Sequence, residues 1–88
     1  EEVKEQKMRV KKINLIKYDC LPENFQTVTR IRHKDSGKMS TANQLENDSV
    51  EVFFHDKVLA IAPGQSAVFY EGEDVVGGGI IENVIGNI

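Results

Sequence analysis

The chain contains 88 residues, 40% of them hydrophobic and 28% charged, which is the composition of one globular domain with a modest core. Collagen-like, low-complexity and disordered chains are excluded, and no apolar run approaches the roughly 18 residues of a membrane span. We therefore expect one domain over residues 1–88, with residues 1–7 as a frayed linker. The start EEVKEQK has neither an initiator Met nor an apolar leader, which predicts a fragment of a longer protein.

The net charge of −3 is unevenly distributed along the chain. Residues 1–40 carry ten Lys and Arg against six acids, whereas residues 41–88 carry one Lys against eight acids. This asymmetry has two interpretations. The basic half can bind along a phosphate backbone, or the charges can be clustered by chance on a solvated surface.

Apolar and basic residues alternate from Met8 to Ile16, as in a half-buried strand. The alternation slips between Val10 and Ile13, which predicts a β-bulge at that point. A loop rich in turn-forming residues follows over residues 18–24.

The next extended segment, residues 25–33, has a basic face. At a spacing of two, Arg30, Arg32 and Lys34 lie about 7 Å apart on one side, close to the spacing of phosphates along a nucleic-acid strand. An outer face kept soluble by charge explains the pattern equally well. A hairpin turn with Gly37 at positive φ is expected next. Three basic residues of the first strand extend the face into a possible stripe: Lys7, Arg9 and Lys11.

The second half of the chain contains further sequence patterns that are typical of strands. Residues 39–45 are polar but extended, residues 46–48 form a turn, and residues 48–56 are the clearest alternating strand. Its two faces are expected to hold two sets of side chains, Val50, Val52 and Phe54 on one and Glu51, Phe53 and His55 on the other.

The last third combines turns with short apolar runs. Pro63 and Gly64 fit the central positions of a type II turn, and the apolar run 66–70 is expected to be covered on both faces. A turn at 72–74 leads into the closing segment GGGIIENVI. With many short strands and no helical periodicity, the sequence predicts an all-β fold, a small closed antiparallel β-barrel of about six to eight strands.

The three consecutive glycines do not match a phosphate-binding loop. A Walker loop needs Lys and Ser or Thr where this chain has Ile80 and Ile81, and a dinucleotide motif needs glycine at the position of Glu82. Phosphate loops also open a helix, and no helical pattern follows. We interpret the glycines as a packing device that lets the last strand bend or lets another backbone approach.

No catalytic or metal-binding constellation is evident in the sequence. Cys20 is the only cysteine and has no basic neighbour, so we interpret it as a structural or incidental thiol in a reducing compartment. His33 and His55 do not have the spacing of a zinc or general-base site. The acids of residues 71–74 are expected to be solvated surface.

Three stretches resemble the C-terminal part of the bacterial tRNA-specific 2-thiouridylases. KKINLI at 11–16 resembles it weakly, TRIRHKD at 29–35 resembles the K-x-R-Y-R-Q segment, and VEVFFHDKVLAIAPGQSAVFYEGEDVVGGGIIE at 50–82 resembles the segment that contains A-P-G-Q-S-A-V-F-Y and G-G-G-I-I. Together they span nearly the whole chain.

The resemblance implies a barrel similar to the second domain of elongation factor Tu, placed after an ATP-pyrophosphatase domain and a small central domain. The parent enzyme would adenylate C2 of the wobble uridine and replace its oxygen with persulfide sulfur, with ATP and Mg as cofactors. This fragment would carry no cofactor, no metal and no catalytic residue. The implied partners are tRNA, the catalytic domains of the same chain, and a sulfur-relay protein or cysteine desulfurase, in the cytoplasm and without a membrane.

The family's tRNA contacts, an Arg-Tyr pair and the Gln of Pro-Gly-Gln, match Arg32, His33 and Gln65. Arg30 and Lys34 are added from the basic strand. Arg32 suits a phosphate, and the turn is expected to aim Gln65 outward with both donor and acceptor available to a base or ribose. His33 keeps a ring in place of the family's Tyr but lacks the phenol.

Two other function classes stay open. The chain could be a barrel module of a translation GTPase, or a structural module that docks on its own catalytic domain. An independent enzyme is disfavoured, because no catalytic group was found.

Overall fold

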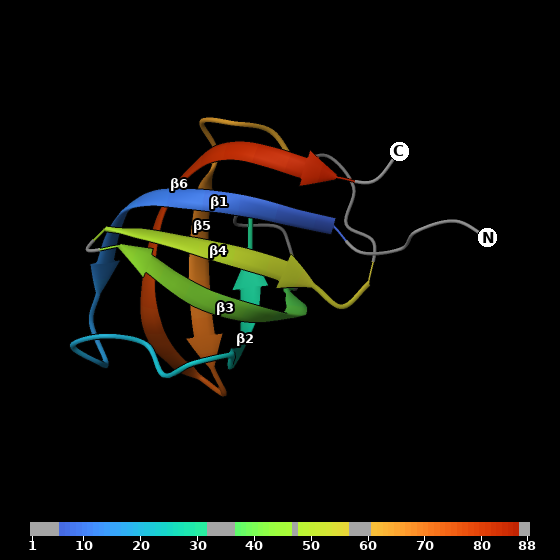
Figure 1. Cartoon of the computed structure of the whole chain (residues 1–88). Helices are drawn as coiled ribbons and strands as arrows, with labels where there is room; N and C mark the ends of the chain where they lie inside the picture. Colours follow the sequence, from blue (N-terminus) through green and yellow to red (C-terminus); the bar gives the residue numbers. More distant parts are fainter. Residues whose placement is uncertain (1–5, 32–36, 47, 57–60, 87–88) are drawn as a thin grey trace.

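The computed structural model describes residues 6–31, 37–46, 48–56 and 61–86, and within these ranges the chain forms strands and no helix. Six strands close into an antiparallel barrel in the order β1-β4-β3-β2-β5-β6 (Figure 1). The all-β barrel predicted from the sequence is therefore confirmed. The strands are β1 (Gln6–Leu15), β2 (Phe25–Arg30), β3 (Lys38–Glu46), β4 (Ser49–Phe54), β5 (Ser66–Glu71) and β6 (Asp74–Gly86).

The first strand contains the predicted bulge. Its pairing with β6 shifts register between Lys11 and Asn14, and Lys12 between them has a φ of 55°. Before the bulge β1 pairs with both β4 and β6, and after it the described pairing is with β6. β1 begins at Gln6, so the last two residues of the expected frayed linker belong to a strand.

The barrel interior is filled by alternate side chains of all six strands. On β4 the inward residues are those expected from the alternation, Val50, Val52 and Phe54. Fully burying a side chain as large as Phe54 or Phe69 contributes roughly 1.5–3 kcal/mol. The buried apolar residues are Met8, Val10, Leu21, Phe25, Ile31, Ala42, Val50, Val52, Phe54, Ala67, Phe69, Val76 and Ile81.

Three buried hydroxyl groups line the part of the interior between β2 and β3. Ser40 donates a hydrogen bond to the carbonyl of Thr27 at 3.0 Å, and the Ser40 and Thr29 hydroxyls lie 2.7 Å apart. Since Ser40 has one proton, Thr29 is the donor of the second bond. The Thr27 hydroxyl donates to the Tyr70 carbonyl at 2.7 Å. Each buried hydroxyl is thereby satisfied.

β5 is buried on one face, so the prediction that both faces are covered is wrong. Ala67 and Phe69 point into the core, whereas Val68 and Tyr70 are half-buried on the outer face. The apolar run therefore supplies the core and also places apolar side chains on the outside of the barrel.

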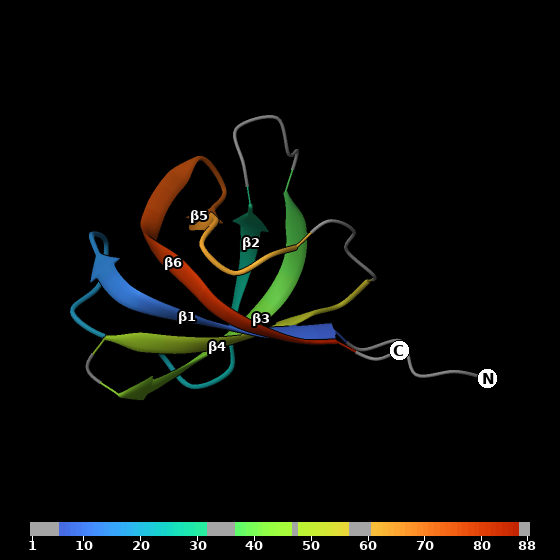
Figure 2. The same ribbon diagram turned by 90° about the horizontal axis from the view of Figure 1, so that it is seen from above.

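β6 closes the barrel by pairing with β1 along one edge and β5 along the other (Figure 2). Gly78 is paired with Asn14 on one side and Val68 on the other. A Cβ atom on Gly78 would lie 2.6 Å from the carbonyl oxygen of Ala67, and one on Gly79 would lie 2.5 Å from that of Lys11. These approaches confirm that the glycines are a packing device.

The turns have the predicted geometry where they are described. Gly64 has a φ of 93°, and Gln65 N donates to the Ala62 carbonyl at 3.3 Å, as in a type II turn around Pro63. Gly37 has a φ of 95°, which confirms the expected positive value.

Candidate nucleic-acid interface

Arg30 ends β2 and points outward, because its neighbours Thr29 and Ile31 are buried. Its guanidinium carbon lies 4.7 Å from the centre of the Tyr70 ring on β5. This cation–π contact uses the flat face of the guanidinium. The N–H edge of the group can still pair with a phosphate.

Gly37 packs closely beside Arg30 at the start of β3. A Cβ atom there would lie 2.5 Å from Cγ1 of Val28 and 3.2 Å from Cγ of Arg30. The lack of a side chain thus leaves room for Arg30 to lie along the barrel wall toward Tyr70.

Three of the five predicted RNA contacts, Arg32, His33 and Lys34, lie outside the described residues and stay predictions. The last strand residue before this segment is Arg30, at the end of β2. Arg30 pairs with Val68 on β5, three residues after Gln65. Arg30 and Gln65 therefore lie toward the same end of the β2–β5 pair.

Gln65 folds back onto its own turn. Its side-chain oxygen accepts a hydrogen bond from the backbone N–H of Ala62 at 2.9 Å. The backbone of the turn is also tied to β6, since Gly64 N and the Gln65 carbonyl both bond to Ile81 at 2.8 Å. The carboxamide oxygen thus uses one of its two lone pairs on the turn, and the side-chain NH2 group is left to act as a donor. The contact of Gln65 with RNA stays a prediction.

The basic residues of β1 do not join Arg30 in one stripe. In the closed ring, two strands separate β1 from β2 in either direction. The predicted single stripe is therefore wrong. On β1, Lys7 instead lies 3.8 Å from Glu51 and 5.0 Å from the centre of the Phe53 ring, both on β4.

The acids near the β5–β6 turn form a cluster that the sequence did not predict. Lys17 Nζ lies 2.9 Å from Glu71 Oε1 and 2.8 Å from Asp74 Oδ2, and the Tyr18 hydroxyl donates to Glu71 Oε1 at 2.6 Å. The backbone N–H groups of Ile16 and Lys17 also donate to the Val76 carbonyl. These bonds pin the segment after β1 to the β5–β6 hairpin, so Glu71 and Asp74 are structural partners of Lys17.

The electrostatics of this cluster follow from its hydrogen bonds. The bond to Asp74, followed by the bond to Glu71, raises the pKa of Lys17. The bond to Glu71 raises the pKa of Tyr18. The bonds from Tyr18 and then Lys17 lower the pKa of Glu71. The cluster therefore holds Glu71 ionised and the other two groups protonated.

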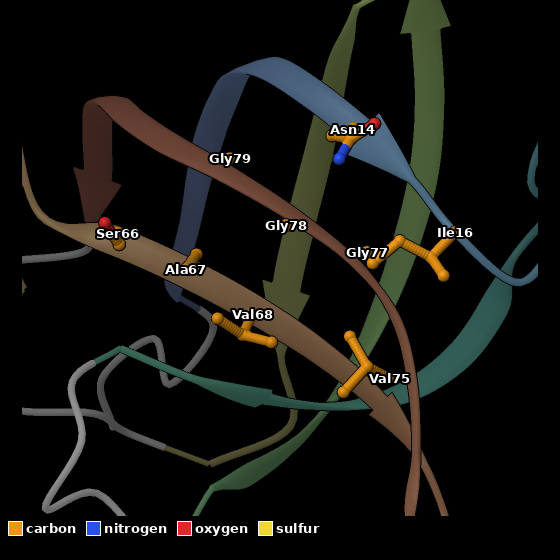
Figure 3. A pocket seen from close by; sticks show the side chains of 9 residues that line it. All are labelled: Asn14, Ile16, Ser66, Ala67, Val68, Val75, Gly77, Gly78 and Gly79. Carbon is orange, nitrogen blue, oxygen red and sulfur yellow. The ribbon is translucent and has the colours of Figure 1, made fainter.

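A hollow of about 290 Å³ lies on the outer face over the three glycines (Figure 3). The backbone of β6 forms its floor, and Ile16 and Val75, which are 67% and 39% exposed, stand at one end. No Lys or Arg among the described residues lines it, so this lining lacks the charge of a phosphate site. The lining residues are Asn14, Ile16, Ser66, Ala67, Val68, Val75, Gly77, Gly78 and Gly79.

The remaining candidate groups have simple surroundings. His55 is exposed at the end of β4, where its Nε2 lies 2.9 Å from the Thr41 hydroxyl, as expected for a polar strand end. Cys20 is an exposed free thiol. Among the described residues, no group of three His, Cys, Asp or Glu side chains is arranged to hold a metal ion. Nor does that part of the chain contain a helix long and apolar enough to cross a membrane.

Residues 5–81 match the family model described as the aminomethyltransferase β-barrel domain. The chain belongs to this family. Among curated proteins, it is 47% identical over 77 residues to the tRNA-specific 2-thiouridylase MnmA of Cytophaga hutchinsonii, covering 86% of this chain and 21% of the relative. It is 43% identical over 86 residues to the protein of the same name from Salinibacter ruber, covering 98% of this chain and 22% of the relative.

The barrel-domain match includes both described contact candidates, Arg30 and Gln65, and the three glycines. The chain spans about a fifth of the length of the curated relatives it matches. What the family shares with this chain is thus the barrel from the start of β1 to the middle of β6.

Proposed function

We propose that this chain is the tRNA-docking barrel of a tRNA-specific 2-thiouridylase. The observation that carries the proposal is the similarity to proteins of that name, 47% identity over 86% of the chain for the Cytophaga hutchinsonii protein. The remaining four fifths of such an enzyme would hold the catalytic machinery. The barrel then serves to hold tRNA while chemistry proceeds on the wobble uridine.

The docking surface in this proposal lies at the end of the β2–β5 pair. Arg30, held against the Tyr70 ring, presents its guanidinium edge to a phosphate. The Gln65 NH2 donates to a base or ribose oxygen while its oxygen braces the turn. The sequence adds three contacts that follow Arg30 in the chain, Arg32 to a phosphate, His33 to a base by stacking, and Lys34 to the backbone.

The parent enzyme in this proposal activates C2 of the wobble uridine by adenylation with ATP and Mg, and a cysteine persulfide supplies the sulfur. The barrel contributes binding and orientation, which matter because holding the two reactants in place removes much of the entropic barrier. The sulfur reaches the enzyme from a sulfur-relay protein or a cysteine desulfurase, in the cytoplasm.

The test is the binding of this chain to an unmodified tRNA transcript over a range of salt concentrations. Arg30→Gln should weaken binding and reduce the slope of log K against log salt by roughly 0.7–0.9, the value for one phosphate contact. Lys11→Gln removes the same charge from β1, across the barrel from β2, and should leave the slope nearly unchanged. Equal effects of the two substitutions would refute a localised interface.

Gln65 offers a sharper comparison, because its two ends have different roles. Gln65→Glu keeps an oxygen for the Ala62 N–H but removes the donor and adds a negative charge, so tRNA affinity should fall with little change in melting temperature. Gln65→Ala should lower both. A Gln65→Glu variant that binds tRNA as tightly as the wild type would remove Gln65 from the interface.

A further inference from the structure

Four outward side chains form a row that crosses strands β1, β4, β3 and β2. Lys7 on β1 pairs with Phe53 on β4, and Phe53 pairs in turn with Thr41 on β3. Thr41 pairs with Gln26 on β2. Directly paired positions on one face have their Cβ atoms about 4.5–5.5 Å apart, so the four side chains are contiguous. β3 lies opposite β6 in the ring, so the Thr41 part of the row is across the barrel from the glycine hollow.

The row combines an aromatic ring with hydrogen-bonding groups. The Lys7 ammonium lies 5.0 Å from the centre of the half-buried Phe53 ring. Gln26 Nε2 donates to the Thr41 hydroxyl at 2.9 Å, and His55 Nε2 lies 2.9 Å from the same oxygen. An open depression of about 460 Å³ is lined by Thr41, Phe53, Phe54 and His55. This volume falls within the roughly 300–1,000 Å³ of small-ligand sites.

A second row joins this depression to the candidate interface. His55 N donates to the Met39 carbonyl at 3.1 Å, Met39 pairs with Val28, and Val28 pairs with Tyr70. Arg30 stacks on that Tyr70 ring. Three steps between strands at about 4.8 Å each place the depression roughly 14 Å from the Arg30 stack along the wall. The curved wall from β1 through β4 and β3 to β2 therefore carries Lys7 at one end and Arg30 at the other, with the half-buried Phe53 ring and the exposed His55 ring between them.

We propose that this depression binds one unstacked nucleobase of single-stranded RNA, stacked on Phe53 and hydrogen-bonded at its edge by Thr41 and His55. The inference rests on the proposed function and extends its interface from β2 and β5 onto β3 and β4. Aromatic rings flanked by cations and polar side chains are the usual means of holding unpaired bases.

A base that stacks on Phe53 must displace Lys7 from that ring. The present contacts of Lys7 are weak enough to allow this. Its pairing with Glu51 is long at 3.8 Å and only partly buried, and is therefore weak, and its contact with the Phe53 ring is also partly exposed. When a base covers the ring, the Lys7 ammonium can move to the adjoining phosphate, which is the stronger partner.

The test uses this chain with two probes, an unmodified tRNA transcript and a heptanucleotide RNA with 2-aminopurine at its centre. Phe53→Leu should weaken binding of the heptanucleotide roughly five- to a hundredfold and restore the quenched 2-aminopurine fluorescence, with the salt slope unchanged. Phe53→Tyr keeps the ring and should bind like the wild type. Lys7→Gln should instead reduce the salt slope by roughly 0.7.

The matched control is Ile16→Ala, which removes exposed apolar surface beside the glycine hollow and should change neither signal. Wild-type affinity and quenching in Phe53→Leu would overturn the proposed base site. If tRNA binding is then still lost in Arg30→Gln, the proposed function stands without this site. If the wild-type chain binds neither the tRNA transcript nor the heptanucleotide, both proposals are overturned.

Discussion

Replacing Gly79 with Ala tests whether the three glycines are required by the close approach of neighbouring strands. The added Cβ would lie 2.5 Å from the carbonyl oxygen of Lys11, 2.8 Å from Cγ1 of Val10 and 3.0 Å from Cδ1 of Ile13. Ordinary contact begins near 3.4 Å, so the Lys11 backbone must move by about 0.9 Å relative to β6. Val10 is fully buried, which leaves its side chain little space to move aside.

The expected loss of stability combines two opposing effects. Overpacking of this kind costs about 1–3 kcal/mol, whereas Ala stabilises by about 0.4–1 kcal/mol because it restricts the unfolded chain. Taken at the midpoints of the two ranges, the net loss is about 1.3 kcal/mol, and the melting temperature of a domain this size should fall by roughly 5–10 °C.

Thermal unfolding followed by circular dichroism measures this change. Gly72→Asn is the control, because a Cβ at Gly72 meets nothing within 4 Å and Asn tolerates its φ of 63°. This control should stay within about 0.5 kcal/mol of the wild type. A Gly79→Ala variant that melts within about 2 °C of the wild type would refute the packing argument.

Two further predictions concern the polar contacts of the barrel. Because the pKa of Glu71 is lowered in the folded state, its charge contributes stability above the usual value of 4.5, and the contribution is lost as pH falls below it. Urea unfolding should therefore show wild type more stable than Glu71→Gln at pH 7, and the difference should shrink as the pH falls below 4.5; a gap independent of pH would contradict this. Thr29→Val removes a buried hydroxyl that donates to Ser40 and should cost about 1 kcal/mol, since Ser40 keeps its bond to Thr27. Urea unfolding of that variant at pH 7 measures the cost, and an equal or higher stability would show that the hydroxyl pair contributes nothing.

The sequence predicted those features that depend on local patterns. The alternation from Val50 to Phe54 identified the buried face of β4, because one-sided burial imposes a period of two. The slip between Val10 and Ile13 identified the bulge for the same reason. Pro63 and Gly64 identified their turn because only a few residues suit its backbone angles.

Features that depend on which strands become neighbours were not predictable in this way. The proposed stripe of basic residues failed because β1 and β2 are not adjacent in the ring. The contacts of Lys17 and Tyr18 with Glu71 join residues more than 50 positions apart, and no spacing in the sequence indicates them. The row from Lys7 to Gln26 likewise exists only through the register of four strands.

The position of β6 between β1 and β5 has a consequence for synthesis on the ribosome. Until residues 74–86 have emerged from the exit tunnel, β1 and β5 each present an unpaired backbone edge, and the core lacks Val76 and Ile81. Such edges are templates for aggregation. We therefore expect the nascent barrel to depend on chaperones until β6 is released, because closure joins the first and last strands of the barrel.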